Sequence, residues 1–167
     1  MKKSQPGFTA GFTLVELVVV ILILGILAAT ALPRFMNVST QAHEAAVAGA
    51  GGGLGAGVAL SHAQWVANGS TAAVAAVPGF GAGNVAVNAS GWPTGTSGAA
   101  SLSTIAHCNE VWNGVMQNPP TLGATNDYTV TLNGATGCTF TYNGTTLMSI
   151  IYESTDGTLT VDSDSSI

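Results

Sequence analysis

The chain has 167 residues, of which only 7% are charged, with eight acidic and three basic side chains. Lys2 and Lys3 stand at the start, so Arg34 is the sole basic side chain of everything that follows. One arginine forms no phosphate-binding patch, which argues against direct binding of nucleic acid. The length allows one compact domain of about 130 residues besides an amino-terminal helix.

The most informative segment is an apolar run from Phe12 to Leu32, in which Glu16 is the only charged residue. About 20 apolar residues at 1.5 Å rise span a bilayer core of about 30 Å. The run therefore predicts a transmembrane helix, and Lys2 and Lys3 before it predict a cytoplasmic amino terminus. A carboxylate within such a segment costs at least about 2.5–3.5 kcal/mol, so it is usually kept for function.

A secretory signal peptide is the main alternative for this run. Its apolar core would hold about 7–15 residues and end at a small-residue cleavage site, which the sequence from Ala28 to Ala31 could supply. The run is longer than that and carries Glu16 near its start, so a retained membrane helix is favoured.

The sequence Gly11-Phe12-Thr13-Leu14-Val15-Glu16-Leu17 and the apolar run after it resemble the processing site and membrane helix of type IV pilins and related pseudopilins. The resemblance implies that a prepilin peptidase cuts between Gly11 and Phe12 and methylates the new amine of Phe12. Glu16 then becomes the fifth residue of the mature chain. At that position the family places an acid that pairs with the amino-terminal amine of a neighbouring subunit during assembly. A cut after Gly7 would put Phe12 at the fifth position instead, so we reject it.

The resemblance further implies an α+β fold, in which a long amino-terminal helix packs on a four-stranded antiparallel sheet. It divides the chain into a leader at 1–11, a transmembrane and filament-core helix at 12–33, a continuation of that helix at 34–64, a variable loop at 65–101, and a short helix with an antiparallel meander at 102–167.

Gly25 and Pro33 lie where the helices of this family are weakened. Proline has no N–H and disturbs the hydrogen bond to the carbonyl four residues earlier, here that of Ala29, which bends or opens a helix. Pro33 is also compatible with a plain membrane-helix boundary.

The stretch after the apolar run is rich in glycine. Each glycine costs about 1 kcal/mol relative to alanine within a helix, so the residues alone leave open a loop or kink at Gly51–Gly53. Gly49, Gly53 and Gly57 lie four apart, and such a stripe of small residues lets another helix or a sheet approach closely. The long helix of the pilin family favours a helix here.

Residues 65–101 contain mostly Gly, Ala, Asn, Ser and Thr and are expected to form a loop, with Trp92 of Gly91–Thr94 as a buried anchor. Apolar residues at helical spacing predict a short helix from Leu102 to Gln117. Four alternating segments then predict an antiparallel meander, with Asn143-Gly144 as a two-residue hairpin turn. The segments begin at Tyr128, Cys138, Leu147 and Leu159.

The chain has two cysteines, Cys108 and Cys138. The pilin topology places both outside the cytoplasm, where disulfides persist, so we expect one disulfide that joins the short helix to the second strand. The chain-entropy model gives such a bridge roughly 3–4 kcal/mol. Two buried free thiols are the alternative.

No catalytic or metal-binding motif is present in the sequence. His43, His62 and His107 lack ligand spacing, and Asp156, Asp162 and Asp164 match no defined calcium loop. No catalytic residue, metal or cofactor is therefore expected, and the chain is expected not to be an enzyme.

The predicted function is that of a structural subunit of a type IV pilus. The chain would wait in the inner membrane with its amino terminus in the cytoplasm, and would then polymerise with itself into an extracellular filament for attachment, aggregation or motility. Subunit contacts outside the helices would come from the 65–101 loop and the strand edges. The implied partners are prepilin peptidase and the assembly machinery, which consists of an inner-membrane platform, an ATPase and a secretin.

Two other functions are weighed against this one. A type II secretion pseudopilin, a periplasmic piston subunit, is the closest alternative, although the expected disulfide and the long loop favour a pilin. An enzyme or ligand-binding domain on a membrane anchor is disfavoured because no catalytic constellation is present. Among pilins the chain is most similar to the type IVa pilins of the mannose-sensitive haemagglutinin type, through Pro33-Arg34-Phe35, Gly91–Thr94 and the Cys108-x-x-x-Trp112 spacing.

Overall fold

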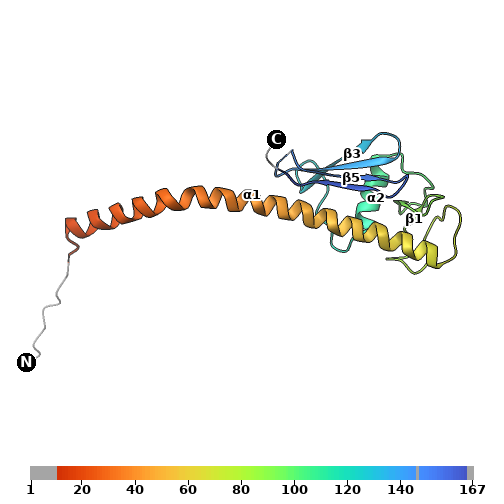
Figure 1. The fold of residues 1–167 in the computed structure, drawn as a ribbon, viewed down its shortest axis with the longest axis horizontal. Helices are drawn as coiled ribbons and strands as arrows, with labels where there is room; N and C mark the ends of the chain where they lie inside the picture. Colours follow the sequence, from red (N-terminus) through yellow and green to blue (C-terminus); the bar gives the residue numbers. More distant parts are fainter. Residues whose placement is uncertain (1–10, 146, 165–167) are drawn as a thin grey trace, which may run out of the picture. The chain divides into compact units, whose positions relative to one another are not determined.

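The computed structural model describes residues 11–145 and 147–164 (Figure 1). The leader expected at residues 1–11 lies outside the described residues, except for Gly11. The chain divides into two compact units, residues 1–39 and 40–167, and each is treated separately. The elements in chain order are α1 (Leu14–Ala67), β1 (Ala86–Val87), β2 (Pro93–Gly95), α2 (Ile105–Val115), β3 (Tyr128–Asn133), β4 (Gly137–Tyr142), β5 (Ser149–Glu153) and β6 (Leu159–Asp162).

Helix α1 is one uninterrupted helix of 54 residues, and it stays helical through the glycine-rich stretch. The loop or kink left open at Gly51–Gly53 does not form. The reason is tertiary, because Val47, Leu54 and Val58 lie buried on one face of α1 and join the hydrophobic core. Burying each such side chain contributes about 1.5–3 kcal/mol, which exceeds the cost of about 1 kcal/mol for each glycine.

Two glycines of α1 allow neighbouring elements to approach its backbone closely. A β-carbon built on Gly57 would overlap the carbonyl oxygen of Val115 at the end of α2, and one built on Gly51 would overlap Val161 of β6. Gly52, by contrast, has open space around it. The glycines at 51 and 57 are therefore packing residues.

Replacing Gly57 by alanine is expected to destabilise the fold by about 1–3 kcal/mol, because the overlapping atom belongs to a backbone that cannot rotate away. Gly52→Ala is the matched control, and its gain in helix propensity should stabilise the fold by about 0.5–1 kcal/mol. Denaturant unfolding of the full chain in detergent, followed by near-UV circular dichroism, measures both. Equal effects of the two substitutions would contradict the packing role of Gly57.

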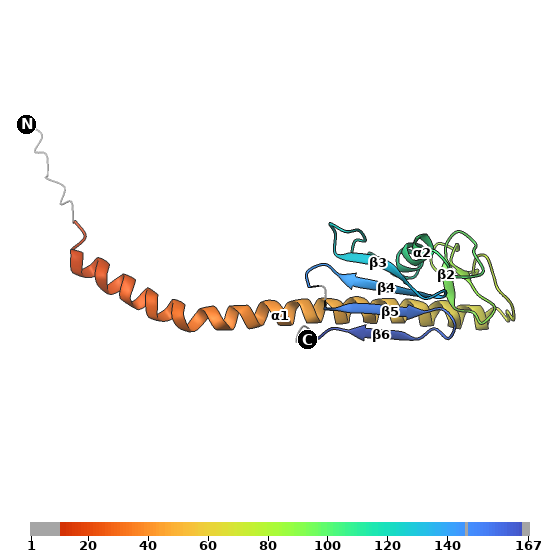
Figure 2. The same cartoon turned by 90° about the horizontal axis from the view of Figure 1, so that it is seen from above.

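The predicted α+β fold is confirmed. Strands β3, β4, β5 and β6 pair antiparallel with their neighbours in that order, as a meander (Figure 2). Phe140, Ile150 and Tyr152 of this sheet are buried together with Val47 and Leu54 of α1 in one core cluster. The carboxyl-terminal half of α1 therefore covers one face of the sheet.

The predicted two-residue hairpin at Asn143-Gly144 is wrong. Residues 143–148 connect β4 to β5, so the connection is longer than two residues. The Asn143 side chain is engaged elsewhere, because its Nδ2 donates to the carbonyl oxygens of Gly123 (2.9 Å) and Asn126 (2.7 Å). It anchors the loop before β3, a long-range role that a turn dipeptide does not reveal.

The segment between α1 and α2 contains a small structure that the sequence did not suggest, the antiparallel pair β1 and β2. Trp92 is half-buried rather than fully buried, and its ring stacks on His62 with the centroids 3.9 Å apart. The hydroxyl of Tyr152 donates to the carbonyl oxygen of Pro93 at 2.8 Å. These contacts attach the segment to both α1 and the sheet.

Helix α2 is shorter than the helix expected from Leu102 to Gln117. The Thr104 hydroxyl accepts the N–H of His107 at 3.2 Å and caps the start of α2. At the other end the backbone of Met116 is extended, and Asn118 has a φ of 49°. Both conformations stop the helix.

The predicted disulfide between Cys108 of α2 and Cys138 of β4 is confirmed. Both residues are fully buried. One turn after Cys108, Trp112 packs on Phe140 with the ring centroids 4.4 Å apart and on Tyr128 with the centroids 5.1 Å apart. The bridge therefore joins helix and sheet at the centre of the core.

Candidate processing and assembly site

The candidate site lies at the start of α1, where the sequence places the processing and assembly residues. Phe12 is 86% exposed and precedes the helix. Thr13 follows as the cap of α1, since the N–H of Leu17 bonds to the Thr13 carbonyl oxygen at 3.3 Å. The bond between Gly11 and Phe12 thus stands directly before a helix, with nothing in the described chain covering Phe12.

Thr13 and Glu16 form a reciprocal hydrogen-bonded pair. Glu16 Oε2 accepts the N–H of Thr13 at 2.9 Å and its hydroxyl at 2.7 Å, while the N–H of Glu16 donates to the Thr13 hydroxyl at 3.3 Å. This arrangement is a capping box, and it satisfies backbone groups that the first turn of a helix leaves free. Within a single copy of the chain, these hydrogen bonds therefore hold the Glu16 carboxylate at the amino-terminal end of α1.

The sequence analysis missed this role of Thr13. The signal was present, because Thr13-Leu14-Val15-Glu16 has the Ser/Thr-x-x-Glu spacing of a capping box followed by an apolar run. The assembly role implied for Glu16 is compatible with the capping box, because one carboxylate oxygen takes both bonds from Thr13 and the other takes none of them.

The apolar stretch of α1 from Leu14 to Leu32 is long and apolar enough to cross a membrane, judged by length and composition. Its large side chains are exposed all round the helix, from Leu14 at 77% to Leu32 at 66%. Exposing a complete apolar helix to water is unfavourable. The stretch requires lipid or another protein surface around it.

The two residues predicted to weaken the helix lie inside α1, which continues through Gly25 and Pro33. The Thr30 hydroxyl donates to the carbonyl oxygen of Leu27 at 3.0 Å, and such bonds back to the preceding turn often bend helices. Besides Gly25 and Pro33, Thr30 is therefore a third residue that can bend or weaken this part of α1. Opening of the helix there remains a prediction.

In the globular unit, each histidine has a partner within the fold. His43 Nδ1 lies 2.8 Å from the Tyr142 hydroxyl, His62 Nδ1 lies 3.2 Å from the Gly91 carbonyl oxygen, and His107 Nδ1 accepts the N–H of Ser103 at 3.3 Å. Among the residues that the structure describes, no three His, Cys, Asp or Glu side chains gather as metal ligands would.

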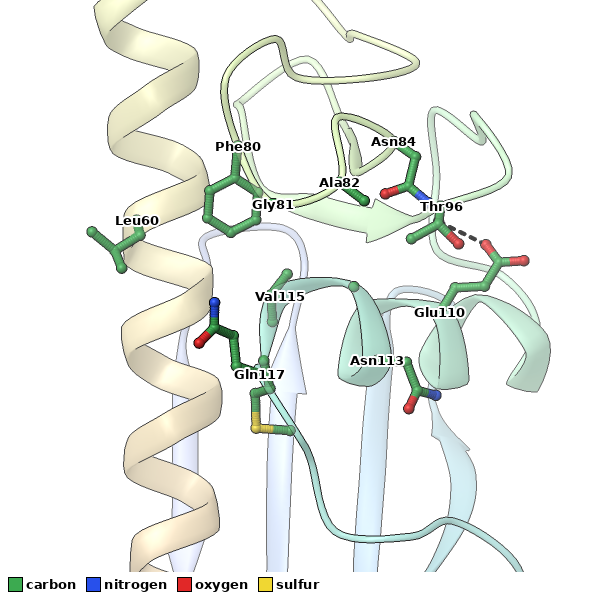
Figure 3. Close-up of a pocket in the computed structure, with 12 residues that line it drawn as sticks. Leu60, Phe80, Gly81, Ala82, Asn84, Thr96, Glu110, Asn113, Val115 and Gln117 are labelled. Atoms are coloured by element: carbon green, nitrogen blue, oxygen red, sulfur yellow. Dashed lines mark hydrogen bonds between the residues drawn. The ribbon is translucent and has the colours of Figure 1, made fainter.

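A cavity with a volume of about 560 Å³ lies at the carboxyl-terminal end of α2. Glu110 closes one side, where its Oε2 accepts the N–H groups of Thr96 (2.8 Å) and Ser97 (3.0 Å). Partial burial raises the pKa of Glu110, but these hydrogen bonds outweigh it and keep the pKa below its usual value. Figure 3 shows Phe80 and Gln117 beside α1, with Glu110 and Thr96 on the side away from it. The Glu110 carboxylate therefore orders the loop at Thr96 and Ser97.

Comparison with known proteins bears on the amino-terminal segment. Residues 2–32 match the family model of the prokaryotic N-terminal methylation motif. The chain is 57% identical over 37 residues to the type IV narrow pilus major component PilA5 of Thermus thermophilus. That similarity covers 22% of this chain and 32% of the relative. No solved structure matches the chain.

The match at residues 2–32 agrees with the expected methylation motif, while the cut between Gly11 and Phe12 and the mannose-sensitive haemagglutinin subtype stay predictions. The amino-terminal segment of this chain therefore carries a prokaryotic N-terminal methylation motif and is similar to a type IV pilus component over 37 residues.

Proposed function

We propose that this chain is a structural subunit of a type IV pilus filament. In this proposal prepilin peptidase cuts between Gly11 and Phe12, and the mature chain waits in the inner membrane with its amino terminus in the cytoplasm. The subunit then polymerises with itself into an extracellular filament for attachment, aggregation or motility. An inner-membrane platform, an ATPase and a secretin serve as its assembly partners, and the chain itself catalyses nothing.

The observation that carries the proposal is the exposed apolar helix directly after the processing motif. None of the described residues buries the stretch Leu14–Leu32, so in this proposal it needs lipid before assembly and protein afterwards. Glu16 supplies the one charge near its start, where an amine of another copy can pair with it.

A type II secretion pseudopilin remains the second candidate, because the processing motif and the apolar helix serve both kinds of filament. Two observations favour the pilus. The Thermus relative is named as the major component of a pilus, and the globular unit is stabilised by a disulfide.

The deciding experiment is to shear surface material from cells and to measure the intact mass and amino-terminal sequence of the released protein. We expect an abundant filament protein that begins at N-methylated Phe12 and is two hydrogens lighter than the reduced chain. A processed chain found only in the cell envelope would favour the pseudopilin. A chain cut near Ala31 would overturn both.

A further inference from the structure

Strand β3 lies at one edge of the four-stranded sheet, with β4 as its strand partner (Figure 2). Successive residues of an antiparallel strand turn their backbone groups to opposite sides. Tyr128 turns its groups away from β4, where its N–H donates to Thr121 and its carbonyl oxygen accepts from Gly123. By this alternation Val130 and Leu132 also face away from β4. On that side, no backbone hydrogen bond joins either of them to another described residue.

The β3 edge, formed by these backbone groups of Val130 and Leu132, lacks the features that usually protect a sheet edge. Native sheets discourage strand addition with charged side chains, proline or a bulge. Strand β3 has neither a charged residue nor a proline, and its register with β4 is continuous. The opposite edge, β6, carries Asp162 and leads to Asp164. Two β6 edges brought together would set carboxylates near one another, which is unfavourable, whereas two β3 edges would not.

A pocket of about 190 Å³ lies beside this edge, between β3 and α2. Its walls are Ile105 and Asn109 of α2, Thr129 and Val130 of β3, and the loop at 122–124. Ile105 is exposed, although it is a large apolar residue. The side-chain oxygen Oδ1 of Asn109 is buried and has no hydrogen-bond partner among the described residues, which is uncommon for a buried polar group. The pocket therefore offers an incoming side chain both apolar walls and a hydrogen-bond acceptor.

From these features we infer that the β3 edge pairs with the β3 edge of a second copy of this chain, and that this contact joins neighbouring filaments into bundles. The two strands run antiparallel and are related by a two-fold axis. Strand addition takes its affinity from backbone hydrogen bonds and its specificity from pockets for alternate side chains. The inference rests on the proposed function, since it requires filaments. It goes beyond the expectation that strand edges make contacts between subunits, because it names one edge, its register and its place between filaments.

The register follows from the open backbone groups. Only with the two-fold axis at Thr131 do both open residues of each copy find partners, since Val130 then exchanges hydrogen bonds with the second copy's Leu132. Directly opposite residues share a face of the sheet, so the second copy's Leu132 lies beside Val130, at the pocket. Leu132 is 38% exposed in the single chain, and its branched side chain matches the apolar walls there. The two-fold axis makes the same contact in both directions.

Symmetry decides that this contact lies between filaments. Subunits of one helical filament follow one another head to tail, so that the contacts along the filament join different surfaces. A two-fold contact joins the same surface of both copies and closes on itself, so it does not continue along a filament. The paired β3 edges therefore belong to two filaments. A single pair of short strands is weak, but two filaments lying side by side repeat the contact, and the repetition strengthens the association.

The first test compares Thr131→Glu with Thr160→Glu in filaments of the full chain. Both threonines are exposed and lie on edge strands, in the cross-strand row Thr131, Thr139, Ile151 and Thr160. In the inferred pair Thr131 lies opposite its own copy, so a glutamate there faces a glutamate. We expect Thr131→Glu to lower the fraction of bundled filaments about tenfold, because the repulsion repeats at each contact. Thr160→Glu should bundle like the unchanged chain, and both variants should keep its filament yield. Electron microscopy and low-speed sedimentation measure bundling.

A mixing experiment tests the two-fold pairing itself. Filaments of Thr131→Glu mixed with filaments of Thr131→Lys should bundle again, because opposite charges then face each other. Mixed filaments that stay single, normal bundling of Thr131→Glu alone, or equal losses for Thr131→Glu and Thr160→Glu would overturn the inference. So would filaments of the unchanged chain that never bundle. Failure of the unchanged chain to form filaments is a different result, since it removes the proposed function.

The second test uses Thr131→Cys, with Thr160→Cys as its control. In the inferred register the two copies of residue 131 form a non-hydrogen-bonded pair with Cα atoms about 4.5 Å apart, a separation that a disulfide spans. The native cysteines are bonded to each other, so the introduced thiol reacts alone. Mild oxidation of bundled Thr131→Cys filaments should give a dimer linked through residue 131, and Thr160→Cys should give none. Bundled filaments without this dimer, or equal dimer formation by both variants, would overturn the inference.

Discussion

Replacing Glu16 by alanine is expected to abolish filament assembly while leaving processing and membrane accumulation intact. If the amine of a neighbouring copy pairs with Glu16 in an apolar environment, removal of the carboxylate leaves that amine without a counter-charge. Breaking a buried ion pair from one side costs about 3–5 kcal/mol, which corresponds to roughly 100- to 4,000-fold in equilibrium. The yield of sheared filaments, measured against total processed protein, reports this loss.

Glu16→Gln is the matched control that separates charge from capping. Glutamine at this position retains a side-chain oxygen that can accept the Thr13 N–H, so the capping box is preserved without the charge. We expect Glu16→Gln to fail in assembly as Glu16→Ala does. Normal assembly of Glu16→Gln would show that the capping box, not the charge, is the contribution of Glu16.

Thr13→Val complements this pair of substitutions. It removes the hydroxyl that bonds to Glu16 but keeps the carboxylate. Loss of a helix cap costs about 0.5–2 kcal/mol, so we expect a weaker effect on filament yield than for Glu16→Gln. A larger loss of filament yield for Thr13→Val than for Glu16→Gln would mean that Thr13 and Glu16 act mainly as a helix cap.

The double substitution Cys108→Ser, Cys138→Ser is expected to lower the free energy of unfolding by roughly 3–4 kcal/mol through the gain in unfolded-chain entropy alone. The effect should be large because both residues are fully buried in the core beside Trp112. A loss of this size is a substantial part of the stability of an ordinary domain, about 5–15 kcal/mol. Denaturant unfolding of the full chain in detergent measures it.

The control for this prediction is a reductant added to both proteins. The reductant should lower the denaturant concentration at which half of the unchanged chain is unfolded, towards the value of the double variant. The same midpoint of the double variant should not change. A double variant as stable as the oxidised chain would mean that the bridge adds nothing to the packing around Trp112.

The amino-terminal segment is the part of this protein that the sequence determined by itself. The methylation motif, the acid at Glu16 and the apolar helix after it are local properties of a continuous run, and the family-model match at residues 2–32 agrees with the motif, while cleavage after Gly11 stays a prediction. The meander was also predictable, because residues two apart on a strand share a face and the alternation is visible in the sequence. The disulfide was expected from two cysteines in a domain that the pilin resemblance would place outside the cytoplasm.

Only the tertiary structure decided the rest, because it depends on contacts between residues distant in the chain. The glycine-rich stretch is helical since Leu54 and its neighbours are buried by the sheet, whereas propensity alone left a loop open. Asn143 anchors a loop around Gly123 instead of making the tight turn that its dipeptide suggests. The buried Trp112 fixes the segment after α2, because its Nε1 donates to the carbonyl oxygen of Pro120. Such contacts are set by packing, which local sequence patterns do not encode.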